Sequence, residues 1–102
     1  MSRYLISPDV IRELNEIFDY FASRSVSAGE RFVEAFENKC RYLIQFPNLG
    51  RSYADFDPSL RGVPLNGYIL FYRVINDGIE IVRVVSGYRD LSSLFSDADE
   101  GN

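Results

Sequence analysis

Arginine is the residue type in this sequence that most plainly offers chemistry, because ten of its eleven bases are arginine. A guanidinium suits planar, two-pronged contacts to a carboxylate or a phosphate. Four arginines precede, interrupt or close the most apolar stretch of the chain, residues 67–90: Arg61, Arg73, Arg83 and Arg89. Each must be paired in such surroundings, either in a structural ion pair or as part of a guanidinium patch that contacts a phosphate or an acidic partner. Both alternatives remain open.

One of these arginines has an acid within reach. If the hairpin loop is Asp77-Gly78, Arg73 lies diagonal to Glu80, and we interpret that pair as structural. The same register places Arg83 opposite Tyr72. For the other three arginines, Arg61, Arg83 and Arg89, the sequence offers no obvious nearby acid except Asp90.

The usual catalytic and metal-binding sets are missing. The sequence has no histidine and one cysteine, Cys40, which excludes histidine-based triads, an internal disulfide and a cysteine zinc site. Cys40 lies on an apolar helical stripe, so we expect a buried, unreactive thiol. Asp9, Glu13 and Glu16 fall in the first turns of a predicted helix, where acids complement the helix dipole. We expect no cofactor and no metal.

Composition indicates one globular domain, residues 1–95, followed by a disordered acidic tail, residues 96–102. The hydrophobic fraction is 46% and the aromatic fraction 15%, as in a chain with a packed core. The net charge is −4, but three of the fifteen acids lie in the tail, so the body is nearly neutral and lacks the basic footprint of a nucleic-acid binder. The apolar runs are too short to span a membrane. We therefore expect a cytoplasmic protein.

The pattern of apolar residues changes along the chain. A Ser-Pro pair at 7–8 predicts the start of a first helix, with its apolar stripe at Val10, Leu14, Ile17 and Phe21. Ser27 and Glu30 form an S-x-x-E capping box that predicts the start of a second helix, and Pro47 predicts its end near Phe46. The short link between the two helices predicts an antiparallel pair.

Strand periodicity dominates after Pro47. Residues 68–86 read as a hairpin of β-branched and aromatic residues around the turn Asn76-Asp77-Gly78, which supplies residues that accept a positive φ. Neither arm has a clean polar face, so we expect at least partial cover on both faces. Residues 60–64 form a further short strand, and Asn66-Gly67 the turn that follows it. The sequence thus predicts an α+β fold, in which an N-terminal strand and a helical hairpin pack on one face of a small antiparallel sheet.

This order of elements resembles the RelE/ParE superfamily of toxins from bacterial toxin–antitoxin modules. The resemblance covers residues 4–95 and rests on four motifs: YLISP at 4–8, FPNLGR at 46–51, YILFYRV at 68–74 and IVRVVSGYRD at 81–90. Each motif alone is modest. Their order and spacing together are what resembles the ParE branch.

The resemblance implies one of two activities. RelE-type toxins cleave mRNA in the ribosome with several basic residues and a C-terminal tyrosine, whereas ParE-type toxins are not nucleases and, where characterised, inhibit DNA gyrase. Here Ile69 takes the place of an arginine, Phe95 takes the place of the tyrosine, and the only lysine is Lys39 in the second predicted helix. These departures favour a non-enzymatic, growth-inhibiting toxin of the ParE type, associated with plasmid stabilisation.

The resemblance also implies partners. One is a ParD-like antitoxin, and its candidate contacts are apolar residues of the closing segment: Leu91, Leu94 and Phe95. The other is gyrase, and the candidates for toxicity lie at one end of the sheet: Arg89 first, then Tyr88, Arg83 and Arg61. No membrane and no sequence-specific nucleic acid is expected as a partner. The alternatives are a RelE-like ribosome-dependent endonuclease and an inactive module that still binds the antitoxin.

Overall fold

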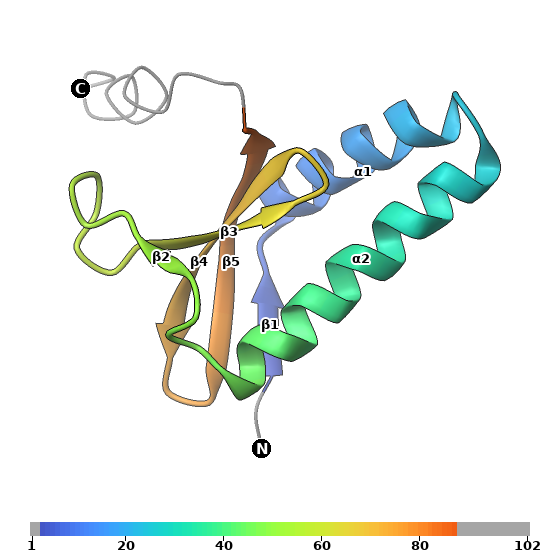
Figure 1. Ribbon diagram of the computed structural model, residues 1–102. Helices are drawn as coiled ribbons and strands as arrows, with labels where there is room; N and C mark the ends of the chain where they lie inside the picture. Colours follow the sequence, from blue (N-terminus) through green and yellow to red (C-terminus); the bar gives the residue numbers. More distant parts are fainter. Residues whose placement is uncertain (1–2, 88–102) are drawn as a thin grey trace.

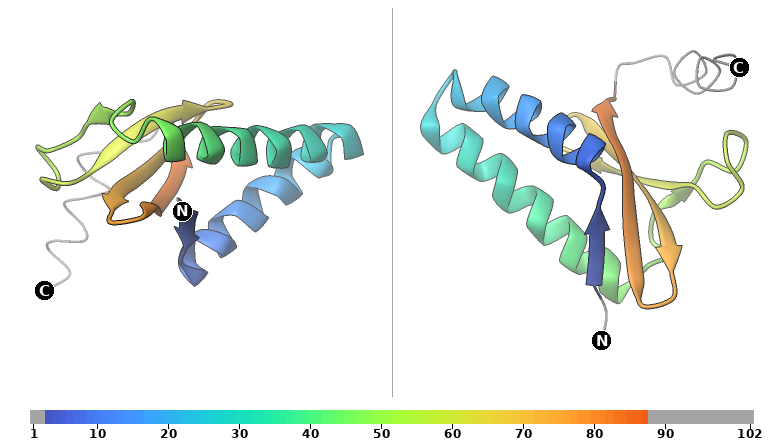
Figure 2. Two further views of the ribbon diagram at one scale, coloured as in Figure 1. Left: turned by 90° about the horizontal axis from the view of Figure 1, so that it is seen from below. Right: turned by 180° about the vertical axis from the view of Figure 1, so that it is seen from behind.

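Two helices cover one face of a five-stranded sheet (Figure 1). The computed structural model describes residues 3–87 of the 102-residue chain. Its elements in chain order are β1 (Arg3–Ile6), α1 (Pro8–Ala22), α2 (Val26–Gln45), β2 (Arg51–Ser52), β3 (Arg61–Leu65), β4 (Tyr68–Ile75) and β5 (Gly78–Ser86). The two helices run antiparallel on the same side of the sheet (Figure 2), which confirms the predicted α+β fold.

The strand order is β1-β5-β4-β3-β2, so the hairpin of β4 and β5 is internal, as predicted. Neighbouring strands are antiparallel with one exception. β1 pairs in parallel with β5, and Tyr4 faces Ile79 while Ile6 faces Ile81. The first strand of the chain is therefore held by the last.

The two turns of the sheet differ. Asn66-Gly67 connects β3 to β4 with φ values of 49° and 85°, in the left-handed region that the predicted tight turn requires. The loop between β4 and β5 is Asn76-Asp77, not the predicted Asp77-Gly78. Gly78 instead opens β5, where β1 passes so closely that a Cβ would lie 1.6 Å from the carbonyl oxygen of Arg3.

An irregularity between Phe71 and Tyr72 shifts the register of β4 against β5. Arg73 lies on the turn side of it and directly opposite Glu80, not diagonal to it, because the loop is Asn76-Asp77; beyond the irregularity, Arg83 lies opposite Phe71, not Tyr72. The Arg73 NH1 group is 3.8 Å from Glu80 Oε1, so the structural interpretation of this pair is confirmed.

Both helices begin at a serine. Ser7 caps α1 as predicted. α2 begins after Ser25, whose Oγ accepts a hydrogen bond from the Ala28 N–H at 3.0 Å. The predicted capping box at Ser27 is wrong, because Ser27 already belongs to the helix and the extended residue before the helix is Ser25. α2 ends just before Pro47, as predicted.

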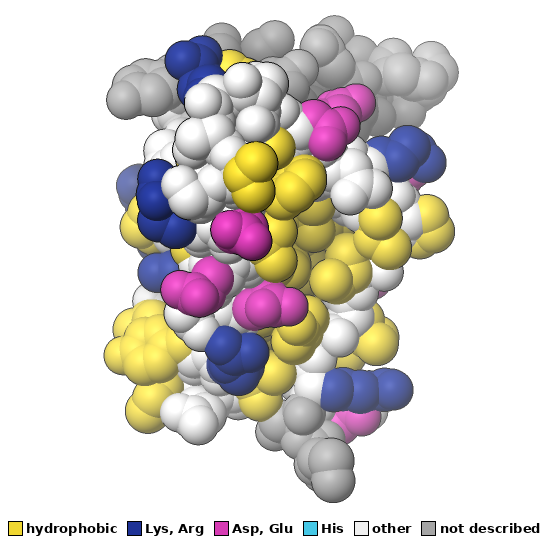
Figure 3. Space-filling model, turned by 90° about the vertical axis from the view of Figure 1, so that its right-hand side faces the viewer, with side chains coloured by type: hydrophobic (Ala, Val, Ile, Leu, Met, Phe, Trp, Pro, Cys, Tyr) yellow, Lys and Arg dark blue, Asp and Glu magenta, His cyan; other side chains and the backbone are white. Residues whose placement is uncertain are grey.

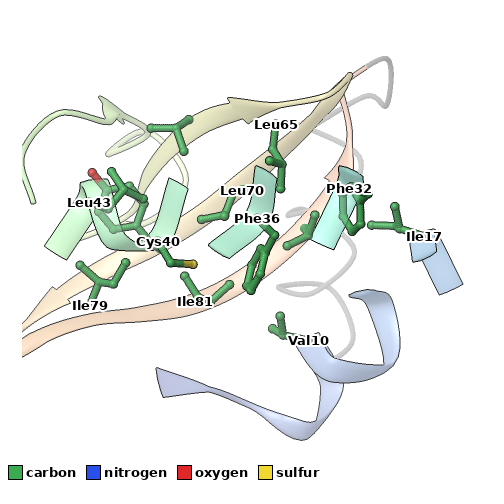
Figure 4. Close-up of a cluster of buried hydrophobic side chains, with 13 residues drawn as sticks. Val10, Ile17, Phe32, Phe36, Cys40, Leu43, Leu65, Leu70, Ile79 and Ile81 are labelled. Atoms are coloured by element: carbon green, nitrogen blue, oxygen red, sulfur yellow. The ribbon is translucent and has the colours of Figure 1, made fainter. Parts of the chain in front are cut away.

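The main core lies between the helices and the sheet (Figure 4). Both helices and strands β3, β4 and β5 contribute buried side chains to it, among them Val10, Ile17, Phe32, Phe36, Leu43, Leu70, Ile79 and Ile81. Cys40 is fully buried among them, which confirms its predicted place in the core. Neither helix is long and apolar enough to cross a membrane.

The opposite face of the sheet is covered by the loop of residues 53–60. A smaller cluster lies beneath this loop: Leu60, Phe71 and Val85, with Tyr53 and Phe56 packed against them. Asp57 ties the loop to the sheet, because it accepts hydrogen bonds from the Ser59 N–H and from Arg73. These hydrogen bonds, the one from the Ser59 backbone first, lower the pKa of Asp57.

Candidate partner-binding groove

The two helices converge at one end and diverge at the other. They meet near their connection, where a Cβ on Gly29 would lie 3.0 Å from Phe18 Cε1 and 3.1 Å from Ala22 Cβ. A larger residue at this crossing would push the helices apart. From there they spread toward β1, as the left view of Figure 2 shows.

An open groove lies between the diverging helices and β1. It has a volume of about 420 Å³. Its lining is mainly apolar and comes from all three elements: Tyr4, Ile6, Leu14, Asn15, Phe18, Phe32, Val33, Phe36 and Glu37. Figure 3 shows the groove as a strip of hydrophobic side chains that runs along the helix side of the molecule.

Rigid core side chains form the floor of the groove, and a more exposed residue forms its lip. Phe32 and Phe36 are 2% and 7% exposed, whereas Val33, on the same helix, is 40% exposed. The Tyr4 ring meets Phe36 edge-on, with 6.4 Å between the ring centroids. Burial raises the pKa of the Tyr4 hydroxyl, and the nearby Cys40 and Glu37 raise it further. The groove therefore offers apolar surface with one carboxylate at its margin.

The Cys40 thiol is buried behind the groove. Burial, and secondarily the Glu37 carboxylate, raise its pKa to about 12. A thiol with such a pKa is almost entirely protonated at neutral pH, so it is a poor nucleophile. Cys40 acts in this region as a small apolar core residue.

Arg83, a predicted target-contact residue, is held by an acid that the sequence reasoning assigned to the helix dipole. The Arg83 Nε group donates to Glu13 Oε2 at 2.7 Å, and Glu13 Oε1 accepts the Val84 N–H at 3.0 Å. Of the two alternatives for Arg83, the structure therefore shows the structural ion pair. The partner lies 70 positions earlier in the chain and is brought close by the packing of α1 beside β5.

Arg61, another predicted target-contact residue, holds the turn that follows α2. Its NH1 group donates to the carbonyl oxygens of Gly50 at 2.8 Å and Asn48 at 3.3 Å. Tyr72 binds the same turn. Its hydroxyl donates a hydrogen bond to the Pro47 carbonyl at 2.6 Å and accepts one from the Gly50 N–H at 2.9 Å. These contacts give Arg61 a structural role.

The structure describes only two residues of the predicted site, and it does not show them acting together. Arg61 and Arg83 lie in described strands but bind different parts of the molecule, the turn after α2 and helix α1. The remaining predicted residues lie outside the described residues: Tyr88, Arg89, Leu91, Leu94 and Phe95.

The groove was not predicted from the sequence. The signal was present, because Phe18 and Val33 widen the apolar stripes of the helices beyond what a single core contact needs. Periodicity assigns such residues to a helix face, but it does not show whether that face meets the sheet or solvent.

Comparisons with known proteins identify the family. The sequence matches the family model of the ParE toxin of the parDE type II toxin–antitoxin system over residues 4–91. Toxin ParE1 of Mycobacterium tuberculosis (strains H37Rv and CDC 1551) is 32% identical over 92 residues, which are 88% of this chain and 94% of that toxin. Toxin ParE3 of Caulobacter vibrioides is 26% identical over 94 residues, or 91% and 94% of the two chains.

A solved structure shows the same fold. A chain of the chromosomal ParDE system from P. aeruginosa superimposes with a TM-score of 0.69 at 19% sequence identity, over 84% of this chain and 96% of that one. The arrangement of helices and sheet described above therefore agrees with the family match over most of the sequence. The chain belongs to the ParE family and is a toxin of a type II toxin–antitoxin system.

Proposed function

We propose that this toxin inhibits DNA gyrase by binding to it, and that a ParD-like antitoxin neutralises it. The observation that carries the proposal is the ParE family match over residues 4–91. The residue types support binding rather than cleavage. In-line RNA cleavage needs a general base and a general acid, and the chain has no histidine and a single lysine.

The described arginines fit the same proposal. Arg61, Arg73 and Arg83 each contact a carboxylate or backbone carbonyls within the fold. Ile69 packs against the small cluster under the loop of residues 53–60, at the position where the nuclease branch carries an arginine. A cluster of free bases around a scissile phosphate is therefore not formed by these residues.

The groove between the helices is the proposed antitoxin site. An apolar groove of about 420 Å³ on a domain of this size is costly to leave in water, and it suits a helix laid along it. The closing segment with Leu91, Leu94 and Phe95 remains a second candidate for antitoxin contact.

The proposed gyrase contact is Arg89, with Tyr88 beside it. These residues come two and three positions after the end of β5 in the sequence, and arginine and tyrosine are the residue types that often carry much of the binding energy in a protein interface. Arg83 is a weaker candidate because Glu13 already binds it. Arg61 is the weakest, because its guanidinium holds the turn after α2.

Induced expression in bacteria tests the proposal. Wild type should stop growth with filamentation and DNA damage, and the purified protein should block supercoiling by gyrase. Arg89→Ala should abolish both effects while antitoxin binding persists. Arg31→Ala is the matched control, because it removes an exposed guanidinium from the outer side of α2. Arrest of protein synthesis within minutes, with normal supercoiling, would show the nuclease alternative to be right.

A further inference from the structure

We infer that the groove between α1 and α2 selects an amphipathic helix with a basic flank on the side that faces α2, so that the antitoxin segment that fills it is positively charged along one side of its apolar stripe. This inference rests on the proposed function for the identity of the partner. It goes further in stating the chemistry that the partner must present.

The α2 margin of the groove carries three carboxylates and, one turn beyond them, Arg41, whose charge also acts on Tyr4 in the groove lining. Glu37 lines the groove, and Glu30 and Glu34 share its side of α2, because the spacing of four and three residues keeps all three on one stripe of the helix. All three side chains are exposed. Figure 3 shows acidic side chains along the border of the hydrophobic strip. The margin opposite, on α1, carries the uncharged Asn15.

The shape of the groove favours a helix. Its long walls are two helices that diverge, and its apolar lining follows their facing sides, with Leu14 and Phe18 on α1 and Val33 and Phe36 on α2. A third helix laid between them can bury a stripe of its own. Basic residues beside that stripe then reach the three carboxylates.

The charge also excludes other occupants. A second copy of this chain, docked symmetrically, would set one acidic stripe near its equivalent. The chain's own last fifteen residues, 88–102, carry four acids against one base, so they have the wrong sign. Nucleic acid is excluded by its phosphates.

Two designed peptides test the inference on the full chain. Both carry the same leucine stripe over about 14 residues, or four helical turns, with either lysine or glutamate along one flank of the stripe. The lysine peptide should bind about tenfold more tightly at low salt, as expected for three exposed ion pairs, and the difference should shrink in high salt. Fluorescence anisotropy of labelled peptides measures both affinities.

Matched variants locate the effect. Glu30→Gln, Glu34→Gln and Glu37→Gln together should abolish the preference for lysine. The control combination Asp9→Asn, Glu16→Gln and Asp55→Asn removes the same charge elsewhere and should keep it. Val33→Ser, at an exposed lip residue, should weaken both peptides alike.

Three results would overturn the inference: equal binding of the two peptides, an unchanged preference in the Glu→Gln combination, or no binding of either. None of them affects the growth and supercoiling assays. Failure of the inference and failure of the proposed function are therefore distinguishable.

Discussion

The two faces of the sheet are covered in different ways. On one face, two helices bury a continuous apolar core that reaches from Val10 to Val84. On the other, within the described residues, the loop of residues 53–60 and the sheet beneath it bury a small cluster of three side chains, and the hydrogen bonds of Asp57 hold the loop in place. The difference teaches that the helix face supplies most of the stability, whereas the loop face depends on a few local contacts.

The largest expected effect comes from a matched pair of leucines, Leu43 on the helix face and Leu60 on the loop face, which are 0% and 2% exposed. Leu43→Ala should cost about 4 kcal/mol and Leu60→Ala about 2 kcal/mol, because the loop relaxes around a cavity more easily than packed helices do. Urea unfolding of the two variants measures both values. Equal costs would contradict the comparison.

The rate of thiol labelling compares how often the structure on each face of the sheet unfolds locally. Cys40 should react with a thiol reagent at neutral pH only as fast as the protein unfolds, because its thiol is buried and its pKa is raised to about 12. Leu60→Cys, in a Cys40→Ala background, should react at least tenfold faster through local opening of the loop. Rapid labelling of native Cys40 would refute the first half of this prediction.

Tyr72 connects the core to the turn after α2, so Tyr72→Phe should have an intermediate effect. The change removes one hydroxyl and leaves the Gly50 N–H without its acceptor, at a cost of about 1–3 kcal/mol. Thermal unfolding measures the loss. An unchanged midpoint would show that the turn does not depend on this hydroxyl.

The smallest effect is expected at Asp57, on the loop face. Its pKa is lower in the folded protein than in the unfolded chain, so its contribution to stability is present above the ordinary aspartate pKa of about 3.9 and is lost as the pH falls through the lower folded value. Asp57→Asn should therefore lower the midpoint of thermal unfolding slightly at pH 7. The difference from wild type should disappear in strong acid, and a difference that persists there would contradict this account.

Features that depend on a few neighbouring residues were predicted correctly from the sequence. The turn at Asn66-Gly67, the end of α2 before Pro47 and the burial of Cys40 follow from φ preference, the missing proline N–H and helical periodicity. The capping box at Ser27 failed because a better cap, Ser25, stands two residues earlier with an extended backbone.

Features set by distant parts of the chain could not be predicted. The irregularity at Phe71 and Tyr72 changed the cross-strand partner of Arg83, and nothing in the hairpin sequence indicates it. Glu13 meets Arg83 only once α1 has packed beside β5. The groove likewise depends on where the helices cross, a point fixed by the contact of Gly29 with Phe18.

The parallel pairing of β1 with β5 has a consequence for synthesis of the toxin. While the ribosome is still making β5, β1 has no strand beside it, and Ile79, Ile81 and Val84 are missing from the helix face of the core. Closing this contact joins the two ends of the domain across a long loop, which is the slow kind of step in folding. We therefore expect the nascent chain to lack the complete fold, and with it the proposed activity, until the synthesis of β5 is finished.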